Sequence, residues 1–114
     1  MQPIPTPEFE ALVADALDSL PPELGELLDN VVVLVEDEHP TEDLYGLYEG
    51  VPQGERGEYG GLELPDRITL YRLPLCADSI SPEELADEVL ITVVHEVAHH
   101  FGIDDDRLHE LGWG

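Results

Sequence analysis

The apolar residues near the start of the chain recur at the spacing of a helix. They form one stripe, made of Phe9, Leu12, Val13, Ala16, Leu17 and Leu20. Thr6 can cap this helix, because a threonine side chain accepts a hydrogen bond from the first turn and Pro7 suits the first helical position. The prolines at 21 and 22 end the pattern. We therefore expect an amphipathic helix that packs one face against a core.

Three runs rich in β-branched and aromatic residues follow, each of the length of a strand. They cover residues 31–37 (VVVLVED), 44–51 (LYGLYEGV) and 67–75 (RITLYRLPL). We expect the third strand to end at Pro74, since proline has no N–H to donate to a neighbouring strand. The connection over residues 52–66 is rich in glycine and proline. It is either a flexible loop or a segment that covers or contacts a substrate.

The last third of the chain carries the clearest helix signal. Ser81 and Glu84 form an S-x-x-E capping box, and Pro82 takes the first helical position. Residues 85–101 (LADEVLITVVHEVAHHF) are apolar on nearly every side, and Gly102 can end the helix in the left-handed conformation. A helix that is apolar all round is a buried helix. We therefore expect His95, Glu96 and His99 to lie in or against the core.

The composition excludes one large class of partner. Aspartate and glutamate number 27 against four arginines and no lysine, so that the formal net charge is −23. Such a surface repels phosphate backbones, and we expect no binding to nucleic acid. It instead attracts cations and basic or neutral partners. At 114 residues the chain has the length of a single domain, which we place at residues 1–114.

No secretory signal is visible at the start of the sequence, and the sequence has no second cysteine. The start (MQPIPTPEFE) has neither the basic nor the apolar segment of a secretory signal, and no apolar stretch is long enough to span a membrane. Cys76 is the only cysteine, so it cannot form an intramolecular disulfide. We expect it to be buried in the core like a small hydrophobic residue. We expect a cytoplasmic protein with no membrane partner, while the choice between monomer and homo-oligomer stays open.

The stretch HEVAHHFGIDDD at residues 95–106 carries candidate chemistry. His95 and His99 are one helical turn apart, with Cβ atoms about 5–6 Å from each other. Two imidazoles at this spacing can bind one zinc ion. Glu96 is rotated by about 100° from His95 and does not fit the same coordination sphere. Its carboxylate can still take a proton from a water on the metal, which is the role of a general base.

A carboxylate shortly after the helix is suited to be the third zinc ligand. With the helix ending at Gly102, the chain can reverse and bring Asp105 back over the histidines, and a carboxylate is an ordinary zinc ligand. Asp104 and Asp106 remain alternatives, although both also suit the N-cap and first turn of a following helix, DDRLHELG. A site without a carboxylate ligand is the remaining alternative. With Asp105, the chain would bind one zinc and keep the fourth position open for water, as in catalytic sites.

The same stretch resembles a known group of enzymes. HEVAHHFGIDD resembles H-E-x-x-H-x-x-G-x-x-D, the pattern of the Asp-zincin metallopeptidases. Together with LYGLYEGVP and LPDRITLYR, the segment HEVAHHFGIDDDRLHELGW resembles a bacterial family of very small zincin-like metallopeptidases. The resemblance implies that His95, His99 and Asp105 bind zinc and that Glu96 is the general base. It also implies an α+β, minimal zincin-like domain, in which a small mixed sheet packs beside the buried active-site helix, with helices at both termini.

The floor of such a metal site has no obvious residue in this sequence. The metzincin branch has a methionine turn beneath the metal, and Met1 is the only methionine. Trp113 is placed to take over this role, or it is an ordinary core residue. We interpret His100 as a residue that packs beside the ligands and His109 as a surface residue. We interpret the four tyrosines as structural residues rather than electrophilic donors.

The motif and the resemblance favour a zinc-dependent peptidase over two alternatives. An extended peptide or protein substrate would add as a strand to an exposed sheet edge, with its scissile carbonyl over the metal. The first alternative is a non-catalytic module with the same fold, which binds a protein partner. The second is a purely structural metal site. Glu96 argues against the second, because structural sites close all four positions and need no base.

Overall fold

The computed structural model describes residues 1–50 and 65–110, apart from the side chains of Asp105 and Leu108. Most of the connection predicted over residues 52–66 lies outside this part of the chain, as do Tyr59 and Trp113. Within the described residues, no helix is long and apolar enough to cross a membrane.

A three-stranded mixed sheet forms one layer of the molecule. Its strands are β1 (Val31–Glu36), β2 (Gly46–Glu49) and β3 (Asp66–Tyr71), in the order β1-β3-β2. β1 runs parallel to β3, and β2 runs antiparallel to it. β3 is therefore the central strand, which explains why five of its six residues are buried. β2 lies at one edge of the sheet.

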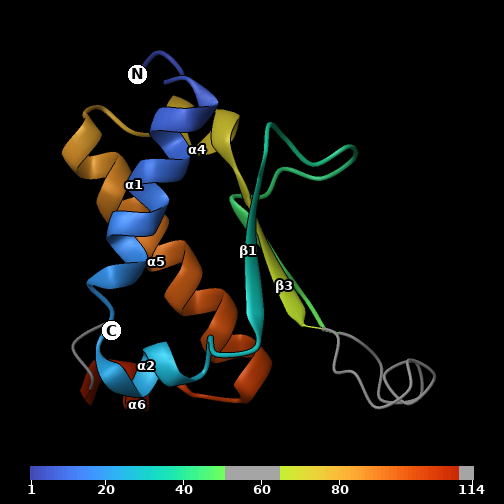
Figure 1. Ribbon diagram of the computed structural model, residues 1–114, viewed down its shortest axis with the longest axis vertical. Coiled ribbons are helices and arrows are strands. Elements are labelled where there is room, and N and C mark those ends of the chain that lie inside the picture. Colours follow the sequence, from blue (N-terminus) through green and yellow to red (C-terminus); the bar gives the residue numbers. More distant parts are fainter. Residues whose placement is uncertain (51–64, 111–114) are drawn as a thin grey trace.

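The helices lie on one side of this sheet (Figure 1). They are α1 (Thr6–Asp18), α2 (Pro22–Glu26), α4 (Arg72–Ala77), α5 (Pro82–Phe101) and α6 (Asp105–Glu110). Of these, α5 is the helix that packs directly against β2 and β3. Figure 1 shows α1 and α5 side by side, with α2 and α6 near the lower end of α1. The α+β class and the small mixed sheet beside a long helix are thus confirmed.

The core lies between α1, α5 and the sheet. Phe9 of α1, Val93 of α5 and Ile68 of β3 are each completely buried. The apolar residues that α5 contributes lie four residues apart and therefore share one face of the helix: Leu85, Val89, Val93 and Val97. A smaller cluster of Leu24, Val94 and Ala98 joins α2 to the C-terminal half of α5. The burial of these side chains fixes α5 beside the sheet.

The predicted ends of α5 are confirmed. The Ser81 hydroxyl oxygen accepts a hydrogen bond from the Glu84 N–H at 3.1 Å, and proline stands in the first turn. Gly102 ends the helix with φ 69°. The Ile103 N–H donates to Ala98 O at 2.9 Å and the Gly102 N–H donates to His99 O at 3.4 Å, which is the Schellman pattern.

Two predicted boundaries are wrong. The first helix begins at Thr6 itself, with Pro5 as the preceding cap residue and no side-chain cap, so Thr6 does not cap it. The third strand ends at Tyr71, before Pro74. Pro74 instead lies in the first turn of α4, where the backbone N–H groups have no partner within the helix and proline is tolerated.

The expected burial of the polar residues of α5 is also wrong in part. His95 and His99 are exposed, and Glu96 is half-buried. The reason is that α1 and the sheet cover only part of α5. Ile91 and Phe101 are apolar, yet they are 39% and 44% exposed. An apolar residue on a helix therefore does not guarantee that another element packs over it.

Candidate active site

The exposed side of α5 carries the candidate zinc-binding histidines. His95 and His99 are one turn apart on a continuous α-helix, so their imidazoles lie on the same side of it. Both rings are accessible to solvent. An ion could therefore reach them without any rearrangement of the core.

His95 and Glu96 line the same hollow, which has a volume of about 360 Å³. One wall consists of α5 residues, among them Glu88 and Thr92, and the other wall is the segment 43–46 that leads into β2. The structure thus brings the first candidate ligand and the candidate base together beside the edge strand.

A glycine allows β2 to lie close against α5. A Cβ atom at Gly46 would be only 2.7 Å from Thr92 Cγ2, a distance at which one of the two elements would have to move. The Thr92 hydroxyl donates to Glu88 O at 2.8 Å, which satisfies this buried polar group within the helix. The separation of β2 and α5, and with it the width of the hollow, therefore depends on Gly46.

A polar cluster holds the C-terminal end of α5 against the sheet. The His100 ring stacks on Tyr48 of β2, with ring centroids 3.9 Å apart and planes 19° from parallel. The Tyr48 hydroxyl donates to Asp66 Oδ2 at 2.8 Å, and His100 Nε2 lies 3.8 Å from the same oxygen. This confirms His100 as a packing residue beside the candidate ligands. The roles of Tyr48 and Asp66 escaped the sequence analysis, since nothing in the sequence relates them to His100.

Tyr45 lines the same hollow, but its hydroxyl proton takes part in a hydrogen bond. Its hydroxyl donates to Asp78 Oδ2. This hydrogen bond, partial burial and the negative charge of Asp78 together raise the pKa of Tyr45 to about 12. The phenol therefore stays protonated at neutral pH with a carboxylate as its partner. This favours the structural role that we expected for Tyr45.

The turn after α5 leads directly into α6. The Asp104 carboxylate accepts a hydrogen bond from the Arg107 N–H at 2.8 Å, and Asp104 thus caps α6, as one of its two predicted roles required. The Arg107 guanidinium also pairs with Glu23 of α2 at 2.9 Å. Asp105 is the first residue of α6, and its side chain lies outside the described atoms.

Two of the three candidate zinc ligands lie among the residues whose side chains the structure describes. Two accessible imidazoles one helical turn apart are the donors that zinc prefers, and they fit two positions of a tetrahedral site. Among the side chains that the structure describes, no group of three or more His, Cys, Asp or Glu could hold a metal ion. The side chain of Asp105, the third candidate ligand, lies outside that set.

Similarities in fold and sequence relate the chain to known proteins. The chain is similar in fold to a conserved hypothetical protein from Thermus thermophilus, with a TM-score of 0.56 and 21% sequence identity over 86% of this chain and 94% of that one. No curated protein matches the sequence. The family model described as zincin-like metallopeptidase matches residues 28–113, which include all three strands, α5 and α6. The chain therefore belongs to the zincin-like metallopeptidase family.

Proposed function

We propose that this protein is a zinc-dependent peptidase, in which His95, His99 and Asp105 bind one zinc ion and Glu96 is the general base. The observation that carries the proposal is that His95 and Glu96 open into one hollow beside an edge strand. Family membership supports the reaction class, since the family is one of metallopeptidases.

The surroundings of Glu96 suit proton transfer. Its side chain is half-buried on α5 and borders the hollow, so it can reach both a water molecule and a substrate there. Zinc, when bound, lowers the pKa of water and polarises a carbonyl group. Glu96 then accepts a proton from the attacking water and returns it to the nitrogen of the leaving amine.

The edge strand suits an extended substrate. Among the described residues, β2 pairs with β3 on one side only. Its other side can offer backbone N–H and C=O groups to a peptide, which would add as a further strand. A peptide bound in this way would pass along the hollow that Glu96 borders. We therefore propose unstructured peptide segments as substrates.

Glu96→Gln tests the mechanism. We expect the variant to bind zinc as the wild type does, because Glu96 is not a ligand, and to lose at least about 10²-fold in turnover, because an amide cannot accept the proton. Zinc affinity is measured by competition with a chelating dye, and turnover by mass spectrometry of an unfolded protein substrate.

Glu83→Gln is the matched control for this experiment. Glu83 is exposed on the same helix and lines neither this hollow nor a neighbouring one, so the control makes the same change in charge away from the substrate. We expect it to retain turnover. Equal turnover of Glu96→Gln and the wild type would refute the assignment of the base. Peptide binding by the wild type with no zinc-dependent cleavage would favour the non-catalytic binding module instead.

A further inference from the structure

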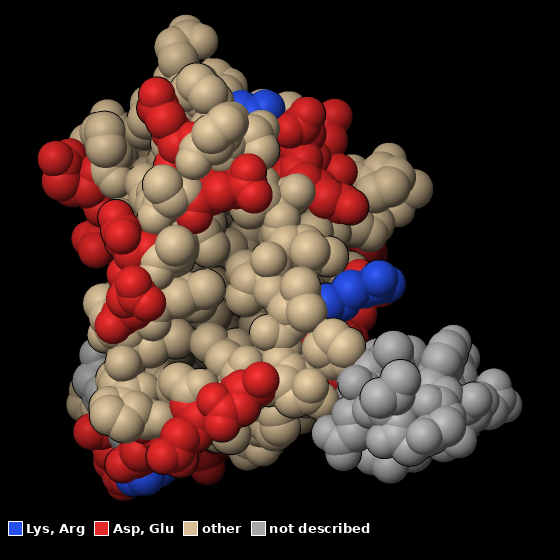
Figure 2. All heavy atoms as spheres, in the orientation of Figure 1, with Lys and Arg blue, Asp and Glu red and all other residues tan. Residues whose placement is uncertain are grey.

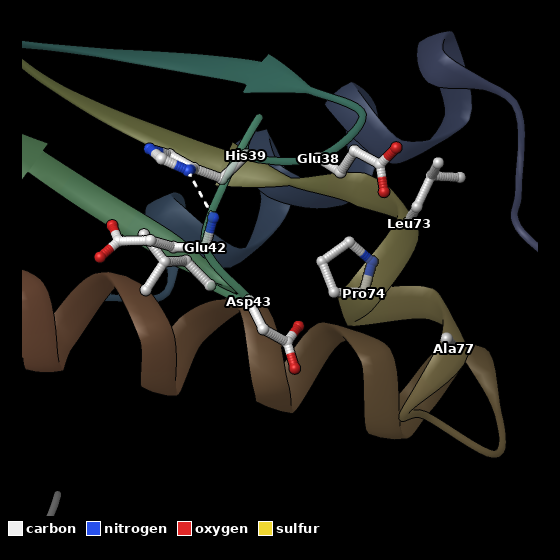
Figure 3. A pocket seen from close by; sticks show the side chains of 8 residues that line it. Glu38, His39, Glu42, Asp43, Leu73, Pro74 and Ala77 are labelled. Atoms are coloured by element: carbon white, nitrogen blue, oxygen red, sulfur yellow. Dashed lines mark hydrogen bonds between the residues drawn. The ribbon is translucent and has the colours of Figure 1, made fainter.

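A second hollow adjoins the first and has a volume of about 270 Å³. Asp43 and Leu44 line both hollows. One wall of the second hollow is the segment 38–44, and the other is formed by α4 (Figure 3). Asp43 and Leu44 therefore lie at the boundary between the two hollows.

The second hollow combines an apolar surface with carboxylates around it. Leu73, Pro74 and Ala77 of α4 form the apolar part. Figure 3 shows the Pro74 ring near the centre, with the Glu38 and Asp43 carboxylates on opposite sides of it. Lysine and arginine side chains need such a surface, because their hydrocarbon stems pack on apolar groups while their charged ends stay among polar ones.

The carboxylates around the hollow have no cationic partner among the described residues. Each described arginine makes its ion pair elsewhere: Arg67 with Glu49, Arg72 with Asp37, and Arg107 with Glu23 and Glu110. None of these three described arginines lines either hollow. The charges of Glu38, Glu42 and Asp43 are therefore available to a positively charged ligand.

The wall that carries these carboxylates is held in place by a histidine. His39 Nδ1 accepts hydrogen bonds from the N–H groups of Thr41 at 3.2 Å and Glu42 at 3.0 Å, and Figure 3 draws the second of these. The His39 ring also packs edge-on against Tyr71, with centroids 5.8 Å apart. A wall that is already ordered loses little conformational freedom when a ligand binds.

We propose that the second hollow receives a lysine or arginine side chain of a peptide whose backbone occupies the first hollow, so that the site selects basic peptides. The inference rests on the proposed function for the role of the first hollow. That hollow extends along α5 from Glu96 to Glu88, or about 12 Å at 1.5 Å per residue. An extended chain covers about 3.3 Å per residue, so the basic residue lies about four positions from the cleaved bond.

Peptide binding tests the inference without requiring turnover. Two labelled ten-residue peptides are compared by fluorescence anisotropy at about 0.15 M salt, where long-range attraction is screened. They are identical and uncharged except for one central position, which is lysine in one and glutamine in the other. We expect the lysine peptide to bind about fivefold more tightly to the full chain. We expect Glu38→Gln combined with Asp43→Asn, which removes the two carboxylates on either side of Pro74, to abolish this preference.

The control must remove the same charge at a distance, because a chain with a net charge of −23 attracts any cation. Glu10→Gln combined with Asp18→Asn does so on α1, where both residues are exposed and neither lines a hollow. We expect this control to keep the preference for lysine. If both variants lost the preference for the lysine peptide equally, or if the wild type showed no such preference, the inference would be overturned.

Cleavage of the same peptides separates this inference from the proposed function. A preference for lysine in binding without any cleavage would support the hollow and contradict the peptidase. Zinc-dependent cleavage of both peptides at equal rates and affinities would support the peptidase and overturn the selection of basic side chains.

Discussion

Asp104 and Asp105 are neighbours in the chain with different proposed roles. Asp104 uses a carboxylate oxygen to accept the Arg107 N–H and so caps α6. Asp105 follows it as the first residue of α6 and is the proposed third zinc ligand. Because the two residues carry the same charge and adjoin one another, each is a control for the other.

We expect Asp105→Asn to weaken zinc binding by at least about tenfold. Changes in residues that only support metal ligands already cost about 10- to 100-fold, and the loss of a ligand costs no less. Asp104→Asn should leave zinc affinity nearly unchanged, since asparagine caps a helix as well as aspartate does. Zinc affinity at neutral pH is measured by competition with a chelating dye. Equal affinities of Asp105→Asn and the wild type would remove Asp105 from the site.

For single residues, the sequence predicts an interaction well when both partners are close in the chain. Ser81 caps α5 through an N–H only three residues later, and that pattern was sufficient to predict it. Tyr48, Asp66 and His100 meet only because β2 pairs with β3 and α5 packs beside β2. Their contact depends on tertiary structure, which no local spacing encodes.

The packing of β2 on α5 depends on the absence of a side chain at Gly46. We expect Gly46→Ala to destabilise the protein by about 1–3 kcal/mol, because its Cβ would lie 2.7 Å from Thr92 Cγ2 in a packed contact. The free energy of unfolding is measured by urea denaturation with circular dichroism. Thr92→Ser removes the methyl group that clashes, and we expect it to restore much of the lost stability in the double variant.

Gly25→Ala is the control for this substitution. A Cβ atom at Gly25 would meet nothing within 4 Å, and the residue lies within α2. Alanine is a better helix former than glycine, so we expect no loss of stability, or a gain of up to about 1 kcal/mol. If both glycine variants lost the same stability, the close approach of β2 and α5 would not explain the effect of Gly46→Ala.

The positions of helices and strands were easier to predict from the sequence than the neighbours that cover them. The three strands and the long helix were correctly located, because their residue types and periodicity are local properties. The strand end at Pro74 was wrong because proline also fits the first turn of a helix. The burial of His95 and His99 was wrong because apolar residues surround them in the sequence, whereas no described element covers that side of α5.

The whole molecule carries far more negative than positive charge. Figure 2 shows Asp and Glu side chains scattered over the visible face, with few Lys or Arg among them. The formal net charge is −23. The described arginines all lie in ion pairs, and pairs as exposed as Arg67–Glu49 and Arg107–Glu23 each contribute only about 0–1 kcal/mol. Repulsion between carboxylates therefore outweighs these attractions in the folded state.

We expect added salt to stabilise the protein for this reason. The screening length falls from about 20 Å near 0.02 M to about 4 Å near 0.5 M, so repulsion weakens most in the compact state, where the charges are closest. The free energy of unfolding in urea should rise by on the order of 1 kcal/mol over this range of sodium chloride. Potassium chloride at the same concentrations should have the same effect, since screening does not depend on the identity of the cation. A stability that fell with either salt would show that the ion pairs, rather than the excess of carboxylates, dominate the electrostatic energy of the fold.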